Sequence, residues 1–244
     1  MEILKSLFLF VSLSIVLALA SCSNESTNPN NQFSMSSYFP TTQGSWWKYE
    51  NWILDSTGAR VKKHSEDSVV IEGTAFIGGK QAIIMADYSR DTNGISRKDT
   101  SYIAIEGSKL LAFVNLIFSD GDSIPWLTMA DLNSANWLIY EKSIRDSNTQ
   151  VSSLYYSMMS GSCGSLLDFS LKGETIKAQE FIINSVSKSS IMTAIDTTQT
   201  DLEGAQQDLY GKGIGQVYSK YMMTKNSGYP LQGFETILVD FEIK

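Results

Sequence analysis

Along most of the chain, apolar and polar residues alternate one by one. The segments 81–88 and 236–243 are clear examples, with an apolar side chain at every second position. Because successive side chains of a β-strand point to opposite faces of a sheet, this period of two predicts strands that are buried on one face. The spacing of 3.6 residues that is typical of amphipathic helices is rare. The pattern therefore predicts a mainly β protein.

Turn signals divide the apolar segments into short strands. All 17 glycines lie after residue 43, and Asn93-Gly94 is a strong hairpin signal because both residues tolerate a positive φ. The pattern also allows one short helix over 126–137 and one over 200–211, where Thr200 and Glu203 have the spacing of a capping box. Many short strands with regular turns predict one antiparallel domain, built as a sheet, a sandwich or an open barrel.

One apolar run departs from this pattern. Leu7–Ala20 contains 14 residues, all but two of them apolar. A membrane-spanning helix needs about 20 apolar residues, so this run has instead the length of the apolar region of a secretory signal peptide. The segment ends in Leu19-Ala20-Ser21-Cys22, which resembles the lipobox of bacterial lipoproteins. The resemblance implies a signal peptide over 1–21 and acylation of Cys22, the new N-terminus.

An acylated Cys22 would anchor the protein in a membrane, since each buried CH₂ group contributes about 0.8 kcal/mol. Ser23 takes the position where, in lipoproteins, an aspartate usually marks retention in the inner membrane, so the resemblance implies the outer membrane. Whether the protein faces the periplasm or the cell surface stays open. Residues 22–37 are polar and rich in Ser and Asn, and they predict a lipidated, flexible tether before a single β domain over 38–244.

Composition limits the classes of function. The chain has 26 acidic and 19 basic residues, a formal charge of −7, which disfavours nucleic-acid binding. Two cysteines and one histidine exclude a disulfide scaffold and a multi-histidine metal centre. Gly211, Gly213 and Gly215 do not match a dinucleotide fingerprint, because Gln216 stands where its third glycine would be. Their spacing leaves one strand face bare, where a backbone or an aromatic ring can pack closely or the sheet can bend. We expect no cofactor and no metal site.

Other chemical groupings have ordinary structural explanations. Cys163 and His64 form a catalytic dyad only if the fold brings them together, and a turn cysteine and a solvated histidine are the simpler interpretation. The acidic segments 91–94 and 120–123 have oxygen spacings that occur in calcium loops, but turn chemistry explains both. The carboxylate pair of a glycoside hydrolase is a spatial feature that a sequence does not reveal. We therefore expect no enzyme activity, with an envelope hydrolase as an alternative.

Three segments resemble a set found in uncharacterised bacterial secreted lipoproteins. Residues 38–49 are similar to an FP-x3-G-x-x-W-x-Y opening. Residues 175–181 are similar to a V-P-A-G-x-F step, with Lys177 and Gln179 in place of the proline and the glycine, and residues 210–217 to a Y-x-x-G-V-G-x-V hairpin. The resemblance implies an antiparallel, strongly curved sheet or open half-barrel, similar to that of lipoprotein carrier and insertion proteins, whose apolar concave face holds acyl chains. The family has no established activity to transfer.

Aromatic residues are the most informative part of the composition, with 5 Trp, 11 Tyr and 11 Phe. Trp46, Trp52, Trp126 and Trp137 are candidates to line a groove for a lipid or to stack on sugar rings, and core packing is the alternative. Trp46 and Trp47 are adjacent, so on a strand one faces the core and the other faces away. The leading prediction is a non-catalytic envelope lipoprotein that binds an apolar or amphipathic ligand on a concave sheet face. The other alternative is a structural or adhesive surface lipoprotein that binds a protein or glycan partner, in an oligomeric state that stays open.

Overall fold

The folded unit begins at Phe33. The computed structural model divides the chain into two units, Met1–Gln32 and Phe33–Lys244. The predicted signal peptide and the lipidation site Cys22 lie outside the described residues, as does most of the acidic segment 120–123. No helix in the described part of the chain is long and apolar enough to cross a membrane. The structure describes residues 33–117, 123–147, 151–193, 196–226 and 231–244.

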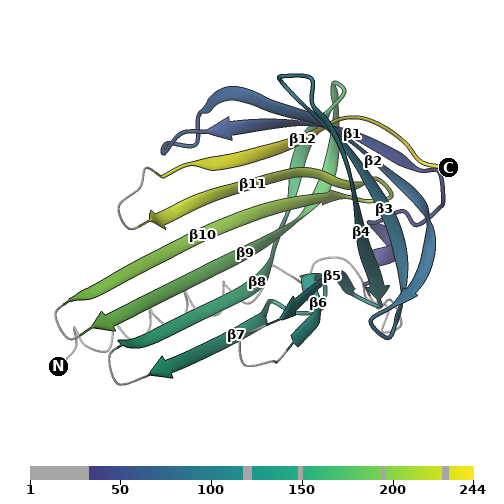
Figure 1. Cartoon of the computed structure of the whole chain (residues 1–244). Coiled ribbons are helices and arrows are strands. Elements are labelled where there is room, and N and C mark those ends of the chain that lie inside the picture. The colour runs from purple at the N-terminus through teal and green to yellow at the C-terminus, as the bar shows by residue number, and fades with distance from the viewer. Residues whose placement is uncertain (1–32, 118–122, 148–150, 194–195, 227–230) are drawn as a thin grey trace, which may run out of the picture. The chain divides into compact units, whose positions relative to one another are not determined.

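Twelve antiparallel strands form one sheet in the second unit (Figure 1). The strands are β1 (Trp46–Leu54), β2 (Arg60–Ile77), β3 (Lys80–Asp91), β4 (Ser96–Glu106), β5 (Lys109–Ile117), β6 (Ser123–Asp131), β7 (Asn136–Ser147), β8 (Val151–Leu171), β9 (Glu174–Thr193), β10 (Thr197–Gly211), β11 (Gly215–Asn226) and β12 (Gly233–Glu242). The order across the sheet is β6-β5-β4-β3-β2-β1-β12-β11-β10-β9-β8-β7, so β6 and β7 are its edges.

The sheet curves until its two edges approach each other. β6 lies close to β7 and β8, although no hydrogen-bonded ladder joins them. The result is a strongly curved, nearly closed antiparallel sheet, and the predicted mainly β, half-barrel-like architecture is confirmed (Figure 1).

Both predicted helices are wrong. Residues 126–137 are divided between β6 and β7, and residues 200–211 lie in β10, which pairs with β9 along its whole length. Pairing with a neighbouring strand satisfies the backbone hydrogen bonds, and this tertiary context overrides the capping-box spacing. The only helix in the described residues is a short 3-10 turn, η1 (Met35–Ser37).

This N-terminal turn belongs to the folded unit rather than to the tether. The Met35 side chain is fully buried in a hydrophobic cluster. The Met35 amide donates to the Gly107 carbonyl at 2.8 Å, and the Gly213 amide donates to the Ser37 carbonyl at 2.8 Å. The turn therefore joins the β4–β5 and β10–β11 hairpins. The predicted boundary after residue 37 is wrong because polar neighbours concealed one core methionine.

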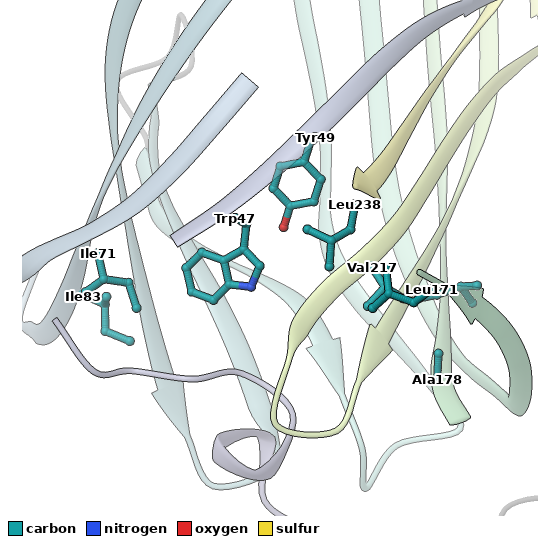
Figure 2. Close-up of a cluster of buried hydrophobic side chains, with 9 residues drawn as sticks. Trp47, Tyr49, Ile71, Ile83, Leu171, Ala178, Val217 and Leu238 are labelled. Carbon is teal, nitrogen blue, oxygen red and sulfur yellow. The ribbon is translucent and has the colours of Figure 1, made fainter. Parts of the chain in front are cut away.

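The main hydrophobic core contains side chains from both halves of the sheet (Figure 2). Trp47 and Tyr49 reach from β1 to the β10–β11 turn, where Trp47 Nε1 donates to the Ile214 carbonyl at 2.5 Å and the Tyr49 hydroxyl donates to the Gln216 carbonyl at 3.0 Å. Gly215 has a φ of +99°, and a Cβ at this position would lie 3.3 Å from Trp47 Nε1. The glycine-rich hairpin thus admits an aromatic ring, one of the packing modes that its spacing predicts.

Candidate functional site

One face of the sheet lines its interior. Phe181 on β9 is fully buried in the core, so its face is the inner one. Residues directly opposite each other on neighbouring strands share a face. We call residues that lie directly opposite one another across neighbouring strands a row. The row of Phe181 continues with Asp208 on β10, Ser219 on β11, Thr236 on β12, Asn51 on β1 and Ser65 on β2. Every residue of this row except Phe181 is polar, so the interior changes to polar chemistry directly beside the core.

Asn51 is the centre of a hydrogen-bonded group on this row. Its Nδ2 donates to Ser65 Oγ at 2.9 Å and to Asp67 Oδ2 at 2.5 Å, and its Oδ1 accepts from Thr236 Oγ1 at 2.6 Å. The other carboxylate oxygen of Asp67, Oδ1, is buried and has no hydrogen-bond partner. A buried acceptor without a donor costs free energy. Asp67 therefore holds an unused acceptor inside the sheet.

Asp87 and Asp99 extend this acidic surface to β3 and β4. Asp87 faces inward, because it is opposite Val69, which is opposite the core residue Trp47. Asp87 and Asp99 are directly opposite each other, a position in which like charges repel. Burial, and then the charges of Asp67 and Asp99, raise the pKa of Asp87 from 3.8 to about 6. The Oδ1 of Asp87 is also buried without a partner. The carboxyl group thus exchanges a proton close to neutral pH.

Sequence reasoning missed this group of carboxylates. They come from three strands, and none belongs to a recognisable motif. The sequence does contain one signal for the inward orientation of Asp87: the period of two places it on the same face as Ile83 and Met85. In the part of the chain that the structure describes, no three histidine, cysteine or acidic side chains are arranged to hold a metal ion.

Another buried carboxylate, Asp208, is fully supplied with donors. Gln206 Nε2 donates to both of its oxygens at 3.0 and 2.9 Å, and Gln216 Nε2 donates to Oδ1 at 3.0 Å. Burial raises the pKa of Asp208, and hydrogen bonds from Ser219, Gln206 and Gln216 oppose this shift. Asp208 therefore acts in the polar packing of the interior, whereas Asp67 and Asp87 each keep an unsatisfied oxygen.

Farther from the core, the inner face mixes hydroxyl groups with exposed apolar side chains. Every second residue of β9 after Phe181 faces inward, and this series includes Ser185, Ser187 and Ser189. The row of Ser187 crosses five strands and also contains Lys142, Ser157, Leu202 and Asn226. Four large apolar residues of this face each expose between 37% and 49% of their surface: Tyr155, Ile191, Leu202 and Phe234. The surface beyond the core is therefore amphipathic.

Two aromatic rings lie against glycines on the same face. A Cβ on Gly161 would lie 2.2 Å from the ring of Trp137, and a Cβ on Gly204 would lie 2.4 Å from the hydroxyl of Tyr221. Because glycine has no side chain, each ring packs directly on the backbone of a neighbouring strand. Aromatic surface thus lies beside the serine hydroxyls.

The structure does not bring the four candidate tryptophans together. Trp46 and Trp52 lie on the face opposite to Trp47, where Trp46 Nε1 donates to Glu242 at 3.0 Å and the Arg60 guanidinium lies 5.2 Å from the Trp52 ring. Trp46 is half-buried and Trp47 is fully buried, so the prediction that these neighbours face opposite sides is confirmed.

The other two tryptophans lie near the sheet edges. Trp126 Nε1 donates to the Gly78 carbonyl at 2.9 Å, and its ring packs on Phe113. Trp137 Nε1 donates to the Thr128 carbonyl at 2.9 Å, which joins β7 to β6. Trp137 is the one of the four that shares the inner face with Phe181, so a ligand-lining role there stays a prediction for this residue.

His64 and Cys163 have different partners. His64 lies on β2 with its ring centroid 6.3 Å from that of Phe234. Cys163 lies on β8, where Gln179 Nε2 approaches its Sγ at 3.4 Å. Five strands separate β2 from β8 in the order of the sheet. These contacts favour the structural interpretation of both residues.

Comparison with known proteins adds a likeness in fold. No protein-family profile and no curated protein matches the chain. A crystal structure of a candidate exported protein with a YmcC-like fold, from Bacteroides fragilis, has a TM-score of 0.43 and 10% identity, and covers 84% of this chain and 98% of that one. A candidate lipoprotein from Parabacteroides distasonis has a TM-score of 0.40 and 12% identity over the same shares. Since both TM-scores are below 0.5, the function proposed below rests on the residues of this chain alone.

Proposed function

We propose that this protein is a cell-envelope lipoprotein, anchored through Cys22 in the outer membrane, whose inner sheet face binds a hydroxyl-rich amphipathic ligand of the glycan class. The observation that carries the proposal is the mixture of exposed apolar side chains and serine hydroxyls on the inner face beyond the core. The predicted signal peptide and the lipobox-like Leu19-Ala20-Ser21-Cys22 support the location.

The serine rows favour a glycan over an acyl chain. An acyl chain laid on this face would remove the hydroxyls of Ser187 and Ser189 from water without offering them a partner, which costs free energy for each unpaired group, whereas the hydroxyl of Ser185 already donates to the Gly204 carbonyl. A sugar has apolar C–H faces that fit Tyr155 and Phe234, and hydroxyl groups that pair with serine. The apolar ligand expected from the resemblance to carrier half-barrels therefore becomes the weaker candidate.

Asp67 and Asp87 add carboxylate groups to the inner face. Each has a buried Oδ1 without a hydrogen-bond partner. Sugar hydroxyls are donors, and hydrogen bonds to an ionised carboxylate are stronger than those between neutral groups. Because both Oδ1 atoms are shielded from solvent, a sugar hydroxyl binds them only if the aspartate side chains turn towards the ligand.

A matched pair of tyrosines tests the proposal. Tyr155 and Tyr156 are adjacent on β8 and lie on opposite faces, with Tyr155 on the inner one. We expect Tyr155→Ala to weaken binding to an array of bacterial envelope oligosaccharides by about tenfold. Tyr156→Ala, the control, should bind like the unchanged protein.

Two results would contradict the glycan proposal. One is equal loss of binding in the Tyr155 and Tyr156 variants. The other is the combination of no binding to the oligosaccharide array and binding of lipid. To detect lipid, the protein is mixed with phosphatidylethanolamine vesicles, and native mass spectrometry then shows added mass that organic extraction releases.

A second function is favoured by Asp87 and Asp99. Their Cβ atoms are expected to be about 4.5–5.5 Å apart, since the residues are directly opposite in register. A carboxyl group with a raised pKa beside another carboxylate is the pairing that glycoside hydrolases use. Release of reducing ends from the array oligosaccharides, abolished by Asp87→Asn, would support hydrolysis. Binding without release would support a non-catalytic role.

A further inference from the structure

The exposed apolar side chains of the inner face are arranged in order across the sheet. Phe234 on β12, Leu202 on β10 and Tyr155 on β8 each leave between 37% and 44% of their surface exposed. In the sheet order β12-β11-β10-β9-β8 they occupy every second strand, and these five strands lie side by side (Figure 1). The fourth exposed residue, Ile191 on β9, lies in the next inward-facing row beyond Tyr155. The exposed apolar side chains therefore span a surface five strands wide.

Positions along the strands can be compared on β10, the middle strand of the five. The row of Phe234 crosses β10 at Gln206. Leu202 lies four residues closer to the start of β10, and the row of Tyr155 crosses β10 two residues closer still, at Thr200. From β12 to β8 the three side chains thus shift in one direction along the strands, and they define a diagonal line across the inner face.

Other inward-facing side chains fill the two intervals of this line. Met223 on β11 is half-buried and lies in the first interval, because its row crosses β10 between those of the two neighbouring members of the line. The second interval holds two hydroxyl groups of β9: Ser187 lies in the row of Leu202, and Ser189 lies in the row of Tyr155. The line therefore combines a nearly continuous apolar surface with hydroxyl groups beside it.

The line is much longer than one sugar. Neighbouring strands lie about 4.8 Å apart, and an antiparallel strand rises about 3.4 Å per residue. Phe234 and Tyr155 are separated by four strand steps and by six residues along β10, which corresponds to about 28 Å measured along the sheet. Since each sugar of an extended glycan advances about as far as one strand spacing, about six sugars cover this distance.

We infer that the inner face binds a linear oligosaccharide along its length, with about six consecutive sugars lying diagonally across β8–β12 from Phe234 to Tyr155. The inference rests on the glycan function proposed above and specifies the substrate class of that site as an extended chain rather than a single terminal sugar. The two aromatic rings stack on sugars at the ends of the line, Met223 and Leu202 contact the sugars between them, and the serine hydroxyls beside the line pair with sugar hydroxyl groups.

Chain length provides the direct test. The array oligosaccharide with the strongest signal is cut and separated by size, from the disaccharide to chains longer than the line. Isothermal titration calorimetry then measures the association constant of each chain with the full protein in detergent. We expect this constant to rise about tenfold or more from the disaccharide to a chain of about six sugars, because added sugars reach new contacts, and to change less than about twofold beyond that length.

A variant at one end of the line should change this length dependence. Phe234→Ala removes the aromatic ring at the β12 end, so the association constant should stop rising at about three or four sugars, and that of the six-sugar chain should fall about tenfold. Phe76→Ala is the control, since Phe76 is 75% exposed but lies on β2, outside the line. It should leave the length dependence unchanged. Circular dichroism verifies that both variants stay folded.

The outcomes separate this inference from the proposed function. An association constant that does not depend on chain length, or a length dependence that Phe234→Ala leaves unchanged, would overturn the extended chain while the glycan function stands. An oligosaccharide array without signal would overturn the glycan function and the inference with it.

Discussion

At the scale of the residue, the most informative group is Asp87. Sequence composition shows a net negative chain, but only the fold places this carboxyl group beside Asp67 and Asp99 in a half-buried position. Its raised pKa means that the folded state binds a proton more tightly than the unfolded state does. The folded protein therefore becomes less stable, through this group, as pH rises from about 4 to about 6.

Replacing Asp87 by Asn removes the cost of ionising the group in the folded state. We expect Asp87→Asn to raise the free energy of unfolding at pH 8 by about 1–2 kcal/mol, a value reduced for solvent screening at a half-buried site. The gain should shrink towards zero at about pH 4, where Asp87 of the folded protein is already protonated. Urea unfolding at both pH values measures this difference. The exposed Asp168→Asn serves as control, since Asp168 pairs with Lys177 at the surface.

At the scale of the element, the 3-10 turn η1 shows how a short polar segment becomes part of a core. Ser34, Ser36 and Ser37 give it the composition of a linker, yet Met35 between them is fully buried. Two backbone hydrogen bonds fix the turn between two hairpins of opposite halves of the sheet. Its contribution to stability therefore comes from one side chain and from these links.

Truncation of Met35 tests this role. Met35→Ala should lower the free energy of unfolding by about 2–4 kcal/mol, because it removes a buried side chain and leaves a cavity. Ser36→Ala, at the exposed neighbouring position, should change it by less than about 0.5 kcal/mol. Chemical denaturation measures both variants. Equal small effects would mean that η1 is detached from the core in solution.

At the scale of the whole molecule, the two sheet edges meet without a backbone ladder. Trp137 takes the place of that ladder at one point: its Nε1 donates to Thr128 of β6, and its ring packs on Gly161 and near Phe181. The two edges are therefore held by the Trp137 side chain and by the short connection 132–135, whose Ala135 carbonyl accepts from the Cys163 amide at 3.1 Å, rather than by strand pairing.

Removal of the Trp137 ring should loosen this junction. We expect Trp137→Ala to lower the free energy of unfolding by about 2–4 kcal/mol, while Trp46→Ala, at a half-buried position on the other face, costs only about 1 kcal/mol. Thermal unfolding compares the two. Trp137→Phe keeps most of the ring packing and should lower the free energy of unfolding less than Trp137→Ala does. If Trp46→Ala lowers it as much as Trp137→Ala, the junction has no special role.

The amino-acid sequence by itself determined the strands, most of their turns and the antiparallel class, because a period of two and hairpin signals such as Asn93-Gly94 are local properties of the backbone. The family resemblance added the strong curvature. The lipobox-like segment containing Cys22 is equally local, and acylation stays a prediction. The two predicted helices failed because capping and propensity are local preferences that strand pairing overrides.

Only the tertiary structure decided which side chains meet. Asp67, Asp87 and Asp99 come from three strands, and their proximity depends on register, which a change of one residue would reverse. The burial of Met35 depends on hairpins far away in the chain. The four candidate tryptophans share a residue type but differ in sheet face and strand position, because aromatic residues fill cores and edges as readily as binding surfaces.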